Sequence, residues 1–203
     1  MICSALWPDA EADNADASLR VALARLRKLL GDAEAVQVRE GKLSLDRRRC
    51  TVDVWALDAL LGKIESAVRG NGKRGETQAL AQRAERLLAL YGGPFLRDER
   101  EQPWMLPLRE QLKSRFIRAA AQLGERLEAQ GSTSEALALY ERALAQEPTA
   151  ERIYRRVMLI QLGEGRKSEA MTTCRRCRDM LSIVLGTQPH AETESLHRRA
   201  QAG

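Results

Sequence analysis

Long segments in which apolar residues recur with helical spacing, separated by glycine and proline, most strongly constrain what this chain can fold into. After Val52 such segments follow one another almost to the end of the 203-residue chain. Leucine and alanine dominate, and aromatic residues make up only 4% of the sequence, which favours a helical protein over a β-sandwich or barrel. The expected helices span residues 54–68, 76–91, 104–130, 134–146, 150–162, 167–185 and 191–200, with a glycine-containing break at residues 69–72.

A 34-residue repeat lies within this helical region. When Ile117 is placed at repeat position 1, successive landmarks fall at positions 7, 8, 20, 24, 27 and 32: Leu123, Gly124, Ala136, Tyr140, Ala143 and Pro148. The tetratricopeptide pattern has Leu-Gly, small residues, an aromatic residue and proline at such places, and its small residues let the paired helices approach closely. A second, weaker unit begins at Glu151. We therefore predict a tetratricopeptide-like helical domain over residues 51–203.

The weaker unit determines how we interpret the sequence Cys174-Arg175-Arg176-Cys177. By itself, a CxxC pair is compatible with a redox-active site or with half of a zinc site. The sequence contains no second CxxC pair, and its two histidines lie in the C-terminal tail. The repeat register places both sulfurs in the helical core, beside Ala170. We therefore predict buried structural thiols and no metal site.

A basic amphipathic helix is expected over residues 17–30. Asp16 or Asn14 is the expected N-terminal cap, and Gly31 ends the helix. The expected buried stripe of this helix consists of Leu19, Ala22, Leu23, Leu26, Leu29 and Leu30.

A β-hairpin is expected directly after this helix. Residues 36–38 and 43–45 alternate around a turn that contains Gly41. A basic helix followed by a small hairpin is the C-terminal half of a winged helix, in which the helix enters the major groove and the hairpin is the wing. Only residues 2–7 are left for the end of an earlier helix. We therefore expect a partial winged helix over residues 1–50, in a chain that begins inside a DNA-binding domain.

Charge is unevenly distributed over this N-terminal region. Residues 1–18 hold four acidic residues and no basic one, whereas residues 19–49 hold nine basic residues against four acidic ones. An acidic segment beside a basic helix and hairpin indicates two partners of opposite charge. From residue 50 onward the charges are spread over long helices, and we interpret them as solvated helix faces.

Several function classes find no support in the sequence. It has no phosphate-binding glycine loop, no HExxH motif and no GxSxG motif, and the carboxylates of Asp98 and Glu99 fall in a polar loop. We therefore expect no enzyme, catalytic residue, cofactor or metal. No run approaches the roughly 18 consecutive apolar residues that a membrane helix needs. The chain start lacks the features of a signal peptide, and four cysteines fit a reducing compartment, so we expect a cytoplasmic protein.

A series of ordered motifs along the chain resembles one known family. The motifs are LWPD at residues 6–9, LRKLLG at 26–31, VDVW at 52–55, YGGPFL at 91–96, PW at 103–104, LRE at 108–110, RF at 115–116 and LYERAL at 139–144. Together they resemble the SARP/AfsR-type bacterial transcriptional regulators and their bacterial transcriptional activation domain (BTAD). The resemblance covers nearly the whole chain.

This resemblance implies an OmpR-type winged helix joined to an all-helical, tetratricopeptide-like activation domain. It makes residues 17–30 the recognition helix and residues 36–45 the wing, and it makes the acidic residues 8–16 a loop that approaches RNA polymerase. The implied partners are double-stranded DNA, RNA polymerase and a second copy of the chain, with no membrane. The expected DNA-binding residues are Arg20, Arg25, Arg27, Lys28, Arg39 and Lys42.

The predicted function is therefore that of a transcriptional activator. Its winged helix binds promoter DNA, and its helical domain serves dimerisation, signal relay or contact with the transcription machinery. The alternative is a protein–protein interaction module with no DNA binding of its own, in which the basic stripe is only a solvated helix face.

Overall fold

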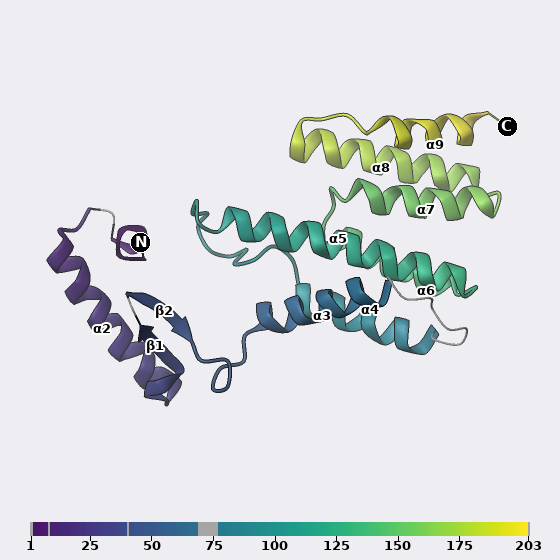
Figure 1. Cartoon of the computed structure of the whole chain (residues 1–203). Helices are drawn as coiled ribbons and strands as arrows, with labels where there is room; N and C mark the ends of the chain where they lie inside the picture. The colour runs from purple at the N-terminus through teal and green to yellow at the C-terminus, as the bar shows by residue number, and fades with distance from the viewer. Residues whose placement is uncertain (1, 8, 40, 69–76, 203) are drawn as a thin grey trace. The chain divides into compact units, whose positions relative to one another are not determined.

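The computed structural model describes residues 2–7, 9–39, 41–68 and 77–202 (Figure 1). The chain divides into two compact units, residues 1–53 and residues 54–203, here called unit 1 and unit 2. The predicted break at residues 69–72 and the predicted helix start at Glu76 lie outside the described residues.

The described residues of unit 1 form two helices, a short 3-10 turn and a hairpin. In chain order they are α1 (Ile2–Leu6), α2 (Ala12–Leu30), the 3-10 turn (Ala33–Ala35), β1 (Val36–Arg39) and β2 (Lys42–Leu45). The strands pair antiparallel in a register that sets Val36 opposite Leu45 and Arg39 opposite Lys42. The predicted helix-then-hairpin order is thus present, with both strands inside the predicted range of residues 36–45.

Helix α2 begins earlier than the sequence pattern indicated. It starts at Ala12 rather than at residue 17, and neither Asn14 nor Asp16 is its cap, because both lie inside the helix. Alanine favours the helix, the side chain of Ala15 is buried, and a carboxylate in the first turn interacts favourably with the helix dipole. The C-terminal prediction is confirmed, since Gly31 adopts the left-handed conformation at φ 69°.

The apolar core of unit 1 is small. Leu23, Ala35 and Val36 are buried, and Leu19 and Cys50 pack against them. The predicted buried stripe is wrong at its C-terminal end, where Leu26, Leu29 and Leu30 are 39%, 84% and 48% exposed; Ala22 is also exposed. Helical spacing identifies an apolar face, but the described elements of unit 1 cover only the strip that runs through Leu19 and Leu23.

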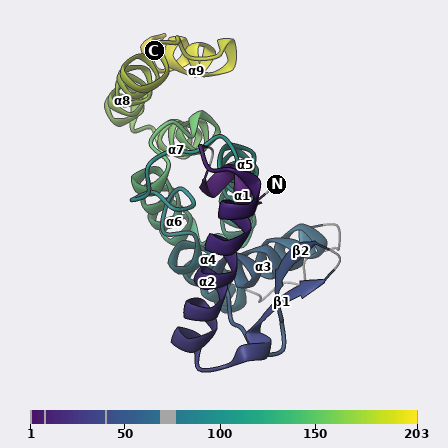
Figure 2. The same cartoon turned by 90° about the vertical axis from the view of Figure 1, so that its left-hand side faces the viewer.

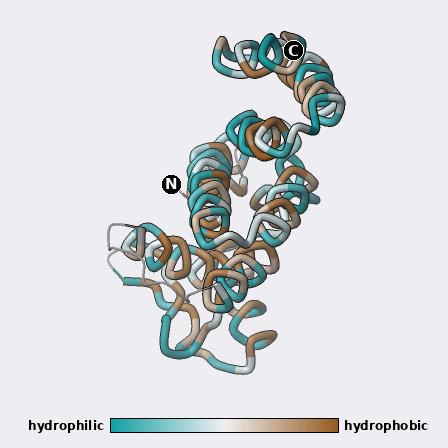
Figure 3. The backbone as a smooth tube through the Cα atoms, turned by 90° about the vertical axis from the view of Figure 1, so that its right-hand side faces the viewer, coloured by the Kyte–Doolittle hydropathy of each residue, from teal (hydrophilic) through white to brown (hydrophobic). Residues whose placement is uncertain are grey.

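Unit 2 is a stack of helices. These are α3 (Asp53–Val68, whose first residue belongs to unit 1), α4 (Thr77–Tyr91), α5 (Leu106–Ala129), α6 (Thr133–Gln146), α7 (Glu151–Gly163), α8 (Lys167–Leu185) and α9 (Ala191–Gln201). Chain neighbours pack together, α5 on α6, α7 on α8 and α8 on α9, as the layers of Figure 1 and the turned view of Figure 2 show. Each helix bears apolar and polar stretches around its circumference (Figure 3). This matches the mainly helical, tetratricopeptide-like architecture that the sequence predicts.

The helix pair α5–α6 is built as the repeat register predicts. Gly124 on α5 lies directly against the ring of Tyr140 on α6, so closely that a Cβ atom at Gly124 would overlap that ring. Tyr140 is fully buried, and its hydroxyl donates a hydrogen bond of 2.7 Å to Oε1 of Glu128. The Leu-Gly and aromatic positions therefore mark a close helix contact.

The two cysteines of the CxxC pair are core residues, as predicted. Cys174 and Cys177 are both fully buried on α8. Burial raises the pKa of the Cys177 thiol to about 12, and burial also raises the pKa of Cys174. Both sulfurs are therefore neutral thiols at physiological pH.

The residues that the structure describes show no cluster of metal ligands and no membrane-spanning helix. Within these residues no group of three or more His, Cys, Asp or Glu side chains is arranged to hold a metal ion. None of the helices formed by these residues has the length and apolar character needed to cross a membrane.

Candidate nucleic-acid interface

Three of the predicted DNA-binding residues lie exposed on α2, between its middle and its C-terminal end. They are Arg20, Arg25 and Lys28, and none of the three side chains forms a hydrogen bond or ion pair with another described residue. Successive residues of a helix are about 100° apart, so Arg20, Ala24 and Lys28 form one stripe and Arg25 lies beside it. The guanidinium and ammonium groups on this face are available to an external anion.

Arg27 is arranged differently from its basic neighbours. It is half-buried, and its Nε and Nη2 atoms donate hydrogen bonds of 3.1 and 2.8 Å to the carbonyl oxygen of Val36. Val36 begins β1 and is 1% exposed. The guanidinium that the resemblance assigned to DNA is therefore directed at the hairpin.

The two predicted wing residues face each other near the hairpin turn. Arg39 ends β1, Lys42 begins β2, and the strand register pairs them directly. Both side chains are exposed, and Gly41 in the turn between them has φ 70°. The tip of the hairpin therefore presents two adjacent cations to solvent.

The base of the hairpin is held by carboxylates. Asp46 accepts hydrogen bonds from the amide of Arg48 at 2.8 Å and from Nε2 of Gln37 at 3.0 Å. Asp32 pairs with Arg49 at 2.7 Å, and this hydrogen bond to the guanidinium lowers the pKa of the Asp32 carboxyl. The guanidinium of Arg49 is thus paired inside unit 1.

The acidic segment does not form a loop along its whole length. Asp13 and Asp16 lie on α2, and Oδ1 of Asp16 accepts a hydrogen bond from Sγ of Cys3 at 3.5 Å. Helix α2 therefore carries acidic residues on its N-terminal turns and basic residues on its C-terminal turns. The charge pattern of the sequence indicates an acidic loop followed by a basic helix, whereas the alanine content of residues 12–17 is the signal for one continuous helix.

Several family-like motifs of unit 2 have structural roles. Tyr91 of YGGPFL stacks on Phe116 of RF with ring centroids 3.9 Å apart, and its hydroxyl donates to the buried carboxylate of Glu147. Arg109 of LRE donates to the carbonyl oxygens of Phe95 and Leu96, each at 2.7 Å. Leu96 has the left-handed φ of 51°, so Arg109 braces a strained turn.

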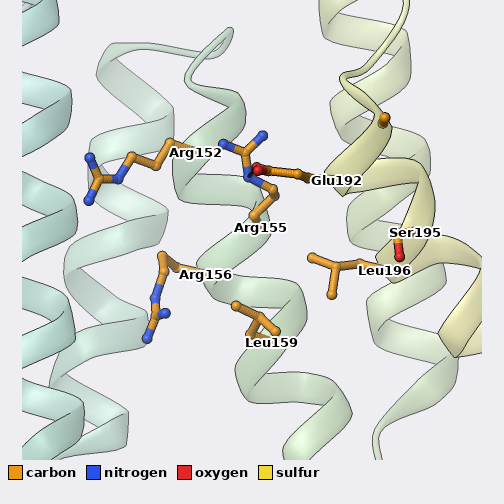
Figure 4. Close-up of a pocket in the computed structure, with 8 residues that line it drawn as sticks. Arg152, Arg155, Arg156, Leu159, Glu192, Ser195 and Leu196 are labelled. Atoms are coloured by element: carbon orange, nitrogen blue, oxygen red, sulfur yellow. Dashed lines mark ion pairs between the residues drawn. The ribbon is translucent and has the colours of Figure 1, made fainter.

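An open cavity of about 720 Å³ lies between α7 and α9 of unit 2. Figure 4 shows the Arg155 guanidinium beside the Glu192 carboxylate, and these groups are 3.4 Å apart. Arg152 and Arg156 pair with Glu125 and Glu128, at 3.4 and 2.6 Å. The arginines of this cavity are therefore held by protein carboxylates, an arrangement typical of a structural ion-pair network.

Comparison with known proteins places these features in a family. Residues 52–201 match the family described as "Bacterial transcriptional activator domain". Regulatory protein AfsR of Streptomyces griseus is 27% identical over 205 residues, a match that covers 98% of this chain and 20% of AfsR. The chain therefore spans about a fifth of the length of this curated relative.

A solved structure has the same fold. It is Mycobacterium tuberculosis EmbR in complex with a low affinity phosphopeptide, with a TM-score of 0.65 and 23% identity. The match covers 98% of this chain and 53% of the EmbR chain. The family match and the similarity to AfsR confirm the resemblance to SARP-type regulators, while the OmpR-type identity of the winged helix stays a prediction. Because residues 52–201 match its model, this chain belongs to the bacterial transcriptional activator domain family.

Proposed function

We propose that this chain is the promoter-binding and activating part of a transcriptional activator. Unit 1 acts as a partial winged helix within residues 1–50, with residues 17–30 of α2 as the recognition helix and residues 36–45 as the wing. Residues 51–203 form the helical activation domain, which serves dimerisation, signal relay or contact with the transcription machinery. The proposed location is the cytoplasm, and no catalytic activity is proposed.

The observation that supports DNA binding best is the exposed basic face of α2 beside a basic hairpin tip. Arg20, Arg25 and Lys28 supply cations without partners in the described part of the chain. The major groove, about 12 Å wide, admits one helix, and Arg and Lys contact both phosphates and base edges there. Arg39 and Lys42 would add phosphate contacts from the wing, each contributing salt-dependent affinity.

The acidic residues that precede α2 and lie on its first turns fit a different partner. Asp9, Glu11, Asp13 and Asp16 are exposed and would repel DNA phosphates, so they favour a basic protein surface. We assign them to contact with RNA polymerase, as the family resemblance implies. The resulting helix meets DNA with one end and protein with the other.

One observation favours the alternative, a protein–protein interaction module without DNA binding. Leu26, Leu29 and Leu30 are exposed on the same helix that carries the basic stripe. Apolar side chains gathered on one helix face are typical of a surface that another protein covers. This alternative predicts that the chain binds no duplex DNA even at low salt.

Charge reversal separates the two proposals. The full chain and its Arg20→Glu/Lys28→Glu variant are titrated with a fluorescent duplex of about 30 base pairs at salt concentrations from about 50 to 200 mM. Arg175→Glu/Arg199→Glu is the matched control, because it reverses the same number of charges at exposed arginines on α8 and α9. We expect the α2 variant to lose binding while the control retains it. Absence of wild-type binding at low salt, or unchanged affinity and salt slope in the α2 variant, would contradict DNA binding by α2.

A further inference from the structure

Arg27 belongs to the inward-facing stripe of α2. Residues four apart lie on the same helix face, and the series Ala15, Leu19, Leu23 and Arg27 follows this spacing. Ala15 and Leu23 are buried, and Leu19 packs against the core of unit 1. Arg27 continues that stripe by one turn, where its guanidinium reaches the hairpin instead of solvent.

The contact made by Arg27 joins two elements that are otherwise linked weakly. Both donors of the guanidinium edge converge on a single acceptor, the carbonyl oxygen of Val36, at 3.1 and 2.8 Å. Hydrogen bonds from a charged donor are roughly twice as strong as neutral ones. The apolar core between α2 and the hairpin is limited to a few residues, so this polar contact contributes a large share of what fixes their mutual orientation.

We propose that Arg27 is a positioning residue, which holds the wing at a fixed angle to the recognition helix, and that it is not a DNA contact. This inference deepens the proposed function and rests on it. The wing cations Arg39 and Lys42 can meet phosphates at the same time as Arg20 and Lys28 only if the hairpin keeps its orientation to α2. Arg27 supplies that constraint through the first residue of β1.

The adjacent Lys28 provides the natural comparison. It carries the same charge and lies on the same helix, but its side chain is exposed and makes no hydrogen bond or ion pair with another described residue. A DNA-contacting residue and a positioning residue therefore stand next to each other in the sequence. Substituting each with glutamine removes one positive charge in both cases, so a difference between the variants reports the role and not the charge.

The first measurement is amide hydrogen exchange of the hairpin in the free, full-length chain. Arg27→Gln is expected to speed exchange in β1 and β2 by about tenfold, because the wing is released from α2. Lys28→Gln is expected to leave that exchange unchanged. If Arg27→Gln fails to fold, judged by circular dichroism, Arg27→Lys replaces it, and this variant is expected to give a smaller acceleration because it lacks the planar fork. Unchanged exchange in folded Arg27 variants would overturn the inference.

The second measurement is a double-mutant cycle in duplex DNA affinity. Lys42→Gln is expected to weaken binding on the order of fivefold in the wild-type background and to have no further effect in the Arg27→Gln background. Losses that multiply would make Arg27 an independent DNA contact and overturn the inference. Failure of the wild-type chain to bind duplex DNA would instead refute the proposed function, and the hydrogen-exchange comparison would then show whether Arg27 still fixes the hairpin.

Discussion

Gly124 is the residue that most directly permits the packing of α5 on α6. The ring of Tyr140 occupies the space that any larger side chain at this position would need. Because Tyr140 is fully buried between the helices, it cannot swing outward without opening the core. The repeat register predicts both residues, since the tetratricopeptide pattern records this close approach.

Substitution of Gly124 tests that contact. Gly124→Ala is expected to lower the free energy of unfolding by about 1–3 kcal/mol, because overpacking forces the ring and the helix backbone apart. Gly62→Ala is the matched control, because Gly62 lies inside α3 with open space at its Cβ position. The control is expected to stabilise the helix by about 0.5–1 kcal/mol. Urea titration measures both, and equal effects would mean that Tyr140 does not pack on Gly124.

Cys177 gives unit 2 a specific response to alkaline pH. Its folded pKa is raised to about 12, while an exposed thiol titrates near 9.0. Between these values the unfolded chain releases the thiol proton and the folded chain keeps it, so rising pH favours unfolding. The stabilisation of the folded chain by the buried, neutral Cys177 thiol is fully present below about pH 9 and declines as the pH rises toward 12.

The expected outcome is a loss of stability between pH 9 and 11 that is smaller in Cys177→Ala than in the wild-type chain. The comparison between variants is required because the buried hydroxyls of Tyr91, Tyr140 and Tyr154 also have raised pKa values. Denaturant unfolding at each pH supplies the measurement. Identical pH dependence in the two proteins would contradict the burial of this thiol.

At the scale of elements, the sequence predicts helix ends better than it predicts buried faces. Gly31 and Gly186 end α2 and α8 because each adopts a left-handed conformation that glycine accepts readily. The sequence pattern places the start of α2 too late, because the acidic residues before residue 17 favour a loop, whereas the helix begins at Ala12. Periodicity also marked Leu26 and Leu29 as buried, since it shows which residues share a face but not whether another element covers that face.

The two ends of the apolar stripe on α2 should therefore respond differently to substitution. Leu23 is 8% exposed and packs on Val36, whereas Leu29 is 84% exposed. Leu23→Ala is expected to destabilise unit 1 by about 2–3 kcal/mol, and Leu29→Ala by less than about 0.5 kcal/mol. Hydrogen exchange of the α2 amides measures both effects. A large effect of Leu29→Ala would indicate that this face is covered in solution.

In the candidate site too, sequence spacing groups side chains on a helix face but does not show which of them contact another element. Composition and spacing identified the basic residues of α2 and the hairpin as a group, including Arg20, Arg27 and Lys28. They did not separate Arg27 from the other two, because the carbonyl that it contacts belongs to a strand nine residues further on. The signal for this difference is the position of Arg27 four residues after the buried Leu23, which places both residues on the inward face of α2.

At the scale of the whole molecule, the chain combines two units whose apolar cores differ in size. Unit 2 has an extended apolar core that runs from α3 to α8, and its match to the activator domain family covers residues 52–201. Unit 1 has a small core, exposed leucines and cations without partners in the described residues. We expect this division of a regulator that binds DNA with one part and other proteins with the other. Unit 2 is a well-packed helical scaffold, and unit 1 exposes apolar and charged side chains that a partner can cover.

The most direct test of this account is hydrogen–deuterium exchange of the full chain with and without duplex DNA, at low salt. The account predicts that DNA slows exchange in residues 19–30 of α2 and in the hairpin around Arg39 and Lys42, and that α5 to α9 are unaffected. Slowed exchange confined to unit 2, or no change anywhere at DNA concentrations that saturate non-specific binding, would contradict the claim that unit 1 is a DNA-binding surface.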